Sequence, residues 1–338
     1  MTLKTGLSAK SVHLGDFNGD GMLDIAVVAE TDSIAVLLRT GAGGYAAPVI
    51  TTTGGAGSWA MATGDFNHDG KLDVAVANNL SNNVSILLGN GDGTFRLAGY
   101  YSTDLSPNAI AVADFNHDGH LDLAVVNSGS GNVTILLGKG DGTFRAVRGI
   151  YLASSPTDAV VGDFNGDGVP DLAVTNGALF SHVVDILLGN GDGTFRAAGS
   201  VTVGNEPFAA AVGYFSQSGK AGLAVANLVS NDISVLTGNG DGTFQAGATY
   251  STGEGPAGIA TGDFNRDGKV DLAVCNDVSG EVTVYLGNGD GTFQAGQSVV
   301  TGGFPTSIAV GDLYGSGRAD MVTAGTTGIV VLRNTTHP

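Results

Sequence analysis

Short apolar runs recur along the whole chain and are separated by polar, glycine-rich turns. In one representative segment, residues 60–66 lead into a polar loop, and residues 72–77 and 84–88 form two apolar runs. A further run starts at Phe95, directly after Asn-Gly-Asp-Gly-Thr at residues 90–94, which is a hairpin turn signal. No stretch shows the periodicity of an amphipathic helix. The pattern predicts an all-β protein in which each segment folds into four short antiparallel strands.

This segment is one unit of a repeat. The motif Gly-Asp-Phe-Asn-Gly-Asp-Gly places its first aspartate at position 16, and the equivalent aspartates follow at positions 65, 114, 163 and 263. Degenerate copies begin at Tyr214 and Asp312, so the units are 49 residues apart with one interval of 51. Four strands in a unit of about 45–50 residues is the size of a β-propeller blade. We therefore expect a single seven-bladed β-propeller that spans residues 1–338.

The two ends of the chain are expected to complete each other. The last unit stops at Asn334, after its third strand, whereas residues 2–5 align with residues 100–103 of a fourth strand. An open solenoid would need caps at its ends rather than a complementary strand. We expect the N-terminal strand to complete the last blade and close the ring.

Charge narrows the classes of partner. The formal net charge of −18 repels phosphate backbones and anionic lipid surfaces, so nucleic acid is not expected as a partner. No apolar run approaches the ~18 residues that a membrane span requires, so membrane insertion is not expected. The first residues lack the features of a signal peptide, and none is expected in this sequence. The single cysteine, Cys275, excludes a disulfide framework and is expected in the core.

More than half of the aspartates lie in one recurring loop, Asp-x-Asn-x-Asp-Gly-x-x-Asp. Like charges at this density repel unless a cation neutralises them. Oxygen donors at positions one, three, five and nine, with glycine at six, suit calcium, and position seven would add its backbone carbonyl. The loop is not an EF-hand, because Val27 stands where the EF-hand has glutamate. Acidic Asx-turns that need no metal are the alternative.

These units resemble FG-GAP (VCBS-type) repeats, which form the blades of integrin α-subunit propellers and of many bacterial extracellular proteins. The resemblance covers all seven units and rests on the acidic loop and its 49-residue spacing. It implies a calcium site between the first and second strands of a blade, and extracellular work in adhesion or carbohydrate recognition. Carried over by position, the side-chain ligands are Asp16, Asn18, Asp20 and Asp24; Asp65, Asn67, Asp69 and Asp73; Asp114, Asn116, Asp118 and Asp122; Asp163, Asn165, Asp167 and Asp171; and Asp263, Asn265, Asp267 and Asp271. The carbonyl ligands at position seven are Met22, Lys71, His120, Val169 and Lys269.

Two loops depart from the motif. The copy at residues 214–219 has no carboxylate and ends at Gly222, so no ion is expected there. The copy that begins at Asp312 keeps only Asp320 as a second acid and is the doubtful case. We expect about five Ca²⁺ ions with a structural role.

Antiparallel strand order separates the loops onto two faces. The acidic loops and the Asn-Gly-Asp-Gly-Thr turns share one face, the repeat-loop face. The loops between second and third strands share the other with the connections between blades; this is the variable face. Most phenylalanines occupy two repeating positions and are expected in the core, but Trp59, Phe180, Phe208 and Phe304 fall on the variable face.

Exposed aromatics beside asparagines suit stacking on a sugar or anchoring a protein. The candidate ligand-binding residues are Trp59, Phe208, Phe180 and Asn108. In the competing interpretation, the aromatics plug the central channel and bind nothing.

The histidines form no catalytic constellation. His182, beside Phe180, is the one candidate on the variable face, and no nucleophile or acid accompanies it in the sequence. The glutamates all lie in variable-face loops, namely Glu30, Glu206, Glu254 and Glu281. We expect a monomeric, non-enzymatic module that recognises a carbohydrate or a protein surface. A ligand-free or engineered repeat scaffold remains an alternative, as does, with less support, a propeller-type polysaccharide lyase or hydrolase.

Overall fold

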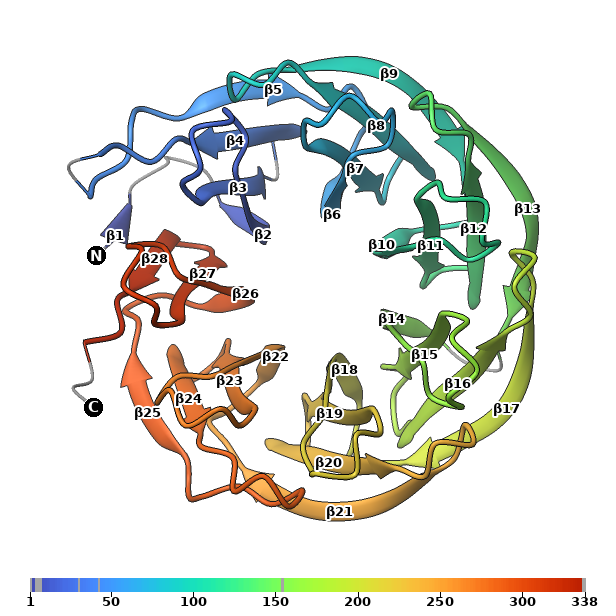
Figure 1. Cartoon of the computed structure of the whole chain (residues 1–338), viewed down its shortest axis with the longest axis vertical. Coiled ribbons are helices and arrows are strands. Elements are labelled where there is room, and N and C mark those ends of the chain that lie inside the picture. The colour runs from blue at the N-terminus through green and yellow to red at the C-terminus, as the bar shows by residue number, and fades with distance from the viewer. Residues whose placement is uncertain (1, 4–7, 30, 42, 153–154, 336–338) are drawn as a thin grey trace.

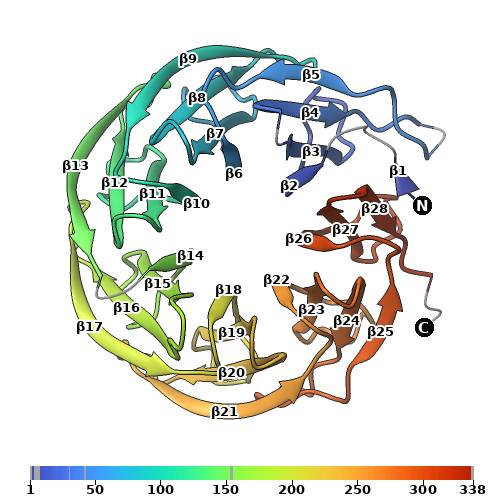
Figure 2. The ribbon, with the colours of Figure 1, turned by 180° about the vertical axis from the view of Figure 1, so that it is seen from behind.

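The structure is a ring of seven four-stranded antiparallel sheets (Figures 1 and 2). It is a computed structural model that describes residues 2–3, 8–29, 31–41, 43–152 and 155–335. All regular elements in these ranges are β-strands, which confirms the predicted all-β, seven-bladed propeller with four strands per blade. The described residues include no helix that is long and apolar enough to cross a membrane.

The strands of each blade run in chain order from the centre of the ring to its rim, and only the last blade takes its outer strand from the other end of the chain (Figure 1). The blades consist of β2 (Ala9–Gly15), β3 (Asp24–Ala29), β4 (Ser33–Leu37) and β5 (Val49–Thr52); β6 (Ser58–Gly64), β7 (Asp73–Asn78), β8 (Asn83–Gly89) and β9 (Phe95–Ser102); β10 (Pro107–Ala113), β11 (Asp122–Asn127), β12 (Asn132–Gly138) and β13 (Phe144–Tyr151); β14 (Pro156–Gly162), β15 (Asp171–Asn176), β16 (Val183–Gly189) and β17 (Phe195–Thr202); β18 (Pro207–Gly213), β19 (Gly222–Asn227), β20 (Asp232–Gly238) and β21 (Phe244–Ser251); β22 (Pro256–Gly262), β23 (Asp271–Asn276), β24 (Glu281–Tyr285) and β25 (Gln297–Val300); and β26 (Pro305–Gly311), β27 (Asp320–Gly325), β28 (Gly328–Leu332) and β1 (Thr2–Leu3).

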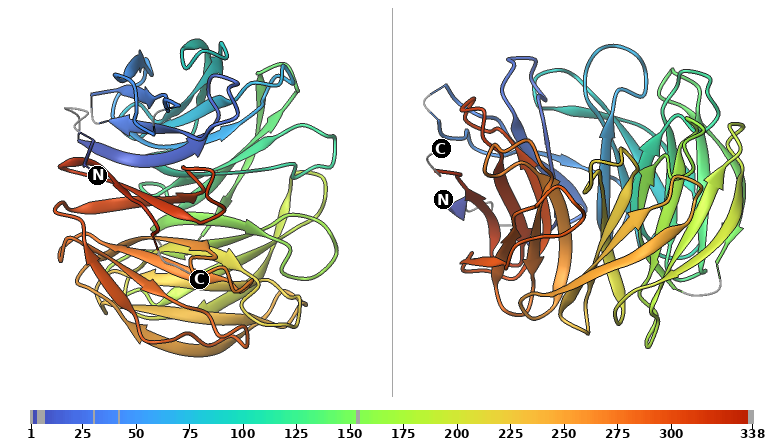
Figure 3. Two further views of the ribbon diagram at one scale, coloured as in Figure 1. Left: turned by 60° about the vertical axis from the view of Figure 1, so that its left-hand side comes forward. Right: turned by 60° about the horizontal axis from the view of Figure 1, so that its bottom comes forward.

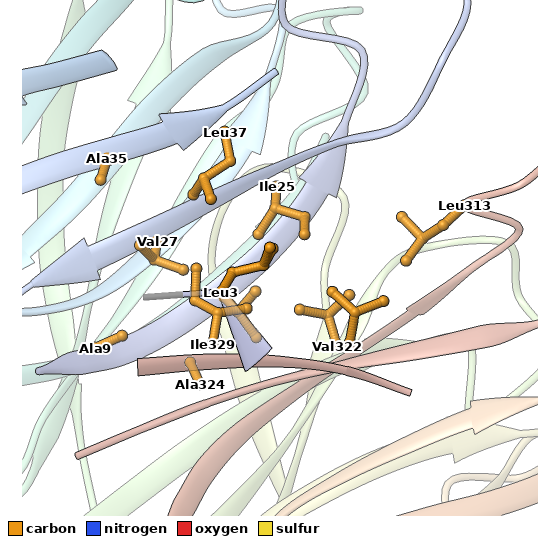
Figure 4. Packing of buried hydrophobic residues seen from close by; sticks show 12 residues of the cluster. Leu3, Ala9, Ile25, Val27, Ala35, Leu37, Leu313, Val322, Ala324 and Ile329 are labelled. Atoms are coloured by element: carbon orange, nitrogen blue, oxygen red, sulfur yellow. The ribbon is translucent and has the colours of Figure 1, made fainter. Parts of the chain in front are cut away.

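The N-terminal strand closes the ring as predicted. Thr2 and Leu3 pair antiparallel with Val330 and Ile329, so β1 is the fourth strand of the last blade (Figure 3). The Leu3 side chain is buried beside Ile329 in an apolar cluster that also includes side chains of the first blade (Figure 4). Lys4 and Thr5, which the sequence also assigned to this strand, lie outside the described residues.

Burial follows the position of each strand in its blade. The second strand is buried along its whole length in six blades, because the neighbouring blades cover both of its faces. Fourth strands such as β17 lie at the rim and expose most of their side chains. The core is accordingly divided into seven apolar clusters, and each contains side chains of two consecutive blades. Cys275 is fully buried in one of them, as expected.

A repeated contact joins one blade to the next. The rings of Phe115 and Phe195 pack edge to face with centroids 5.3 Å apart, and Gly193 N donates a hydrogen bond of 3.1 Å to Phe115 O. Phe115 belongs to an acidic loop, whereas Gly193 and Phe195 belong to the Asn-Gly-Asp-Gly-Thr turn of the following blade and its fourth strand. The same ring pair and hydrogen bond recur at four more interfaces, between Phe17 and Phe95, Phe66 and Phe144, Phe164 and Phe244, and Phe215 and Phe293. These turns therefore reverse the chain and also dock neighbouring blades.

Replacing Gly193 with alanine should destabilise the protein. Gly193 has φ +81°, and an added Cβ would lie 2.8 Å from Leu137 Cδ2. We expect Gly193→Ala to lower the free energy of unfolding by more than about 1 kcal/mol, since both strain and the displaced turn oppose docking. Urea unfolding of Gly193→Ala should be compared with Gly41→Ala, where an added Cβ meets open space. Equal stabilities of the two variants would contradict the docking role.

Candidate functional site

Each of the five full acidic loops is held by its own side chains. In the second blade, Asp65 accepts backbone hydrogen bonds from Asp69 N (3.1 Å) and Gly70 N (2.8 Å). Asn67 Oδ1 accepts one from Asp69 N (2.9 Å), and Asp69 Oδ1 accepts one from Lys71 N (3.0 Å). The other four full loops repeat this pattern. The oxygens at positions one, three and five are thus turned into the loop.

The aspartate at position nine lies beneath the loop. Asp73 is fully buried, and its carboxylate accepts hydrogen bonds from Phe66 N (2.9 Å) and Gly89 N (2.8 Å). It therefore ties the start of the acidic loop to the end of the third strand. Burial raises the pKa of Asp73 to about 6; the two backbone hydrogen bonds oppose this rise, and repulsion from Asp69 and Asp65 adds to it. Asp122 shows the same arrangement, and burial raises its pKa to about 6 as well.

The loop residues fit calcium by their chemistry. In every full loop, repulsion from the acids at positions one and five contributes to the raised pKa at position nine, so the three carboxylates are close enough to repel each other. A divalent cation would remove that repulsion and is suited to oxygen donors of this kind. No group of three or more His, Cys, Asp or Glu side chains is arranged around one point within the described ranges, and the position-nine carboxylates face backbone amides.

The two degenerate loops separate the roles of these positions. In the fifth blade, the Ser216 and Ser218 hydroxyls share a hydrogen bond of 2.9 Å, and Gly222 occupies position nine. In the last blade, Asp320 at position nine still accepts hydrogen bonds from Leu313 N (3.0 Å) and Asn334 N (2.8 Å). Asp320 keeps this contact although its loop has lost the acid at position five. The tie to the backbone is therefore independent of a complete set of calcium ligands.

The variable face carries a second candidate site around the central channel. The first strand of every blade has an irregularity in register at its second residue; in β10, for example, pairing skips Asn108 between Pro107 and Ala109. A β-bulge of this kind redirects a side chain away from the regular alternation. The seven bulge residues all line one cavity of about 430 Å³. They are Lys10, Trp59, Asn108, Thr157, Phe208, Ala257 and Thr306.

This ring brings together three of the four residues that the sequence suggested for ligand binding, Trp59, Phe208 and Asn108. The fourth, Phe180, does not line the cavity; it is 77% exposed in the loop between β15 and β16. Trp59 is 42% exposed, and Lys10 Nζ lies 4.8 Å from the centre of its ring, which is a cation–π contact. The aromatics of the ring thus lie at the channel, as the competing interpretation also required, but they leave a cavity.

Sequence reasoning missed Asp158, which also lines the cavity. Its carboxylate accepts hydrogen bonds from Ala159 N (2.8 Å) and Ala210 N (3.1 Å), and burial raises its pKa. The equivalent residues of the other blades are small and uncharged, namely Ser11, Ala60, Ala109, Ala209, Gly258 and Ser307. The sequence did contain a signal for this residue, because Asp158 is the one charged side chain at a repeat position where the other blades have small, uncharged residues. His13 lines the cavity too, and burial lowers its pKa to about 4, so its imidazole is neutral at pH 7.

Substitution of Asp320 tests the backbone role of position nine. We expect Asp320→Ala to lower the free energy of unfolding by at least about 2 kcal/mol, because the buried amide of Leu313 and the partly buried amide of Asn334 lose their acceptor. The loss should be the same in calcium and in chelator. Thermal unfolding should show a smaller loss for Asp312→Ala, whose amide partners in the same loop lie nearer to solvent. A loss for Asp320→Ala that needs calcium would show that position nine acts through an ion.

The sequence and the fold were compared with known protein families and solved structures. A model of the FG-GAP-like repeat matches residues 16–76, 67–125, 114–174, 215–274 and 263–323. No curated protein sequence matches the chain. Among solved structures, BBS1N in complex with ARL6DN is 14% identical, with a TM-score of 0.68 over 97% of this chain and 93% of that one.

Two further structures share the fold at low identity. An Agrocybe aegerita lectin that recognises non-reducing terminal N-acetylglucosamine is 19% identical, with a TM-score of 0.58 over 86% of this chain and 80% of the lectin. A protein from Lactobacillus plantarum is 18% identical, with a TM-score of 0.68 over 88% of this chain and 86% of that one. Because the repeat model covers most of the seven units, the chain belongs to the family of FG-GAP-like repeat proteins.

Proposed function

We propose that this protein is a calcium-binding recognition module that holds its ligand at the central channel, on the variable face. The observation that carries this proposal is the ring of seven bulge residues around one cavity. The blades repeat the same fold at these positions, yet their side chains are basic, aromatic, polar or small. Such a difference in chemistry on a constant backbone is typical of a recognition surface rather than of packing.

Two solved neighbours support recognition as the activity. One is a propeller in complex with ARL6DN, and the other is a lectin that recognises N-acetylglucosamine. Both classes of ligand, a protein surface and a carbohydrate, are compatible with aromatic and amide groups at the mouth of a cavity. The ligand class is narrowed further below.

Calcium would be held by positions one, three, five, seven and nine of the five full loops. Four of these five loops contribute a phenylalanine to the Phe–Phe contact with the next blade, so an ion there would hold the loop in the shape that docking needs. If each site binds with a constant of about 0.1 mM, millimolar calcium adds roughly 1.4 kcal/mol per site. Calcium is millimolar outside cells, and we propose that the module works there.

Removal of calcium should therefore lower the melting temperature. We expect differential scanning calorimetry in 2 mM CaCl₂ and in excess chelator to differ by several degrees, because five sites contribute to the folded state alone. Asp65→Ala should reduce this difference by removing one ligand at position one. Ser216→Ala, in the loop without carboxylates, is the matched control and should leave the difference unchanged. A melting temperature that ignores chelator would contradict the calcium proposal.

The ligand site is tested at Trp59. The chain has one tryptophan, so intrinsic fluorescence reports directly on the mouth of the cavity. A glycan array and a panel of peptides, screened in calcium, supply ligands whose binding is then titrated by fluorescence. We expect Phe208→Ala to weaken a bound ligand at least about tenfold through loss of buried aromatic contact, and Phe180→Ala, outside the cavity, to have no effect. Ligands that bind equally to both variants would place recognition elsewhere.

A further inference from the structure

Asp158 is a partly buried acid that lines the cavity, and no ion pair joins it to a basic side chain of the described residues. Its hydrogen-bond partners among the described residues are two backbone amides, Ala159 N and Ala210 N. No basic side chain is among the groups that shift its pKa. A buried carboxylate is costly unless it is paired, and a packed protein seldom keeps one without a reason. The other six blades have Ala, Ser or Gly at this position, so the fold does not require an acid there.

A second unsatisfied acceptor lies in the adjacent blade. Asn108 Nδ2 donates to Pro156 O at 3.4 Å, but Asn108 Oδ1 is buried without a hydrogen-bond partner in the described part of the chain. A carboxylate has about four acceptor positions and an amide oxygen about two, so Asp158 and Asn108 together retain several free acceptors. Both residues line the central cavity. Among the described residues, no side chain donates a hydrogen bond to either of these acceptors, and a ligand in the cavity can supply the donors.

Aromatic side chains border this wall on both sides. Around the ring, consecutive blades contribute Trp59, Asn108, Asp158 and Phe208 to the lining of the cavity. An aromatic face attracts a cation and also packs against an alkyl stem. From one blade to the next, the cavity is therefore lined by an aromatic ring, an amide, a carboxylate and a second aromatic ring.

We propose that this wall binds an organic cation, an ammonium or guanidinium group on an apolar stem. The N–H groups of such a cation donate to Asp158 and Asn108, its charge pairs with the carboxylate, and its stem packs against Trp59 and Phe208. The proposal rests on the channel mouth as the ligand site and names the chemistry that this site selects. The cation can belong to a free amine or to a lysine or arginine side chain of a protein partner.

The charges on the variable face favour the same ligand. Glu206, Glu254 and Glu281 lie at this end of the ring, and Glu30 lies outside the described residues. Among the lysines and arginines in the described ranges, Lys10 alone lies on a strand end or loop of this face; the others lie in repeat-loop segments or on outer strands. A face with this balance of charge concentrates cations near the cavity and increases their rate of association. It also disfavours a second copy of this chain as the partner.

The test compares charged and neutral probes on the calcium-loaded full chain. Hexylamine, N-acetyl-lysinamide and N-acetyl-argininamide are titrated by Trp59 fluorescence and isothermal calorimetry, with 1-hexanol as the neutral counterpart of hexylamine. We expect the charged probes to bind and hexanol to bind at least about tenfold more weakly, because it cannot pair with the carboxylate. Equal binding of hexanol and hexylamine would overturn the proposal.

Matched variants locate the interaction. Asp158→Asn and Glu254→Gln each remove one negative charge, but only the first residue lines the cavity. We expect Asp158→Asn to weaken amine binding at least about tenfold and Glu254→Gln to change it less than about twofold. Asn108→Leu provides a second measurement that leaves the carboxylate in place, and it should weaken binding as well. Equal effects of Asp158→Asn and Glu254→Gln would show that the amine responds only to the overall negative charge of the variable face and not to Asp158 itself, and would overturn the proposal.

Stability separates a binding role of Asp158 from a structural one. Because Asp158→Asn removes a partly buried charge that forms no ion pair among the described residues, we expect the melting temperature of the ligand-free protein to stay the same or rise. A fall in melting temperature together with unchanged amine binding would assign Asp158 to the fold. Competition by CaCl₂ that is much stronger than competition by KCl or NaCl at the same ionic strength would assign the wall to an inorganic cation and overturn the proposal.

The source of the cation follows from affinity. Peptides with a lysine between apolar residues that bind at least tenfold more tightly than hexylamine indicate a protein partner, and equal affinities indicate a free amine; both outcomes support the organic cation. If no cation binds but a glycan does, and Phe208→Ala abolishes that binding, the proposed channel site stands and this inference fails.

Discussion

The contact between neighbouring blades is the interaction on which the remainder of this structure depends. One blade of four short strands cannot bury its second strand alone, since both faces of that strand need a cover. Each apolar cluster is therefore shared by two blades, and at five of these boundaries an edge-to-face phenylalanine pair lies beside the cluster. Closure by β1 extends this rule to the last interface, where Leu3 shares a cluster with Ile25 of the first blade.

The acidic loop and the hairpin turn serve this same contact from opposite sides. The loop presents the carbonyl of Phe115, and the turn of the next blade presents the amide of Gly193. The position-nine carboxylate holds the base of the loop through two backbone amides, so the loop is positioned even where the other acids are lost, as at Asp320. Any ion in the loop would act on a scaffold that is already hydrogen-bonded. The conformation of the acidic loop and the docking of the next blade are thus linked at these five interfaces.

The sequence predicted the architecture because the same pattern of four strands recurs in seven units. The period gave the number of blades, and the missing fourth strand at Asn334 gave the closure. It did not predict the docking role of the turns, since the partner of Gly193 is a carbonyl in another unit and no pattern within one unit indicates it. The spacing of the acidic loop named candidate ligands for an ion, but the hydrogen bonds between the position-nine carboxylate and backbone amides became visible only in the structure.

The sequence indicated only some of the residues at the candidate ligand site. Trp59 and Phe208 share one repeat position, which grouped them correctly at the channel, whereas Phe180 lies in a loop whose direction the sequence does not state. Asp158 was missed for a physical reason. Neighbouring residues of a regular strand face opposite sides, but at the bulge of β14 both Thr157 and Asp158 line the cavity.

The bulges also have an evolutionary consequence. A bulge residue takes no part in the pairing of its strand, and its side chain contributes little to the clusters between blades. Single substitutions at the bulge positions can therefore change which ligand the channel binds, one blade at a time, while the apolar clusters between the blades stay the same. When a blade is duplicated, its backbone and its contacts with neighbouring blades are copied, whereas the side chain at the bulge position can change without loss of the fold.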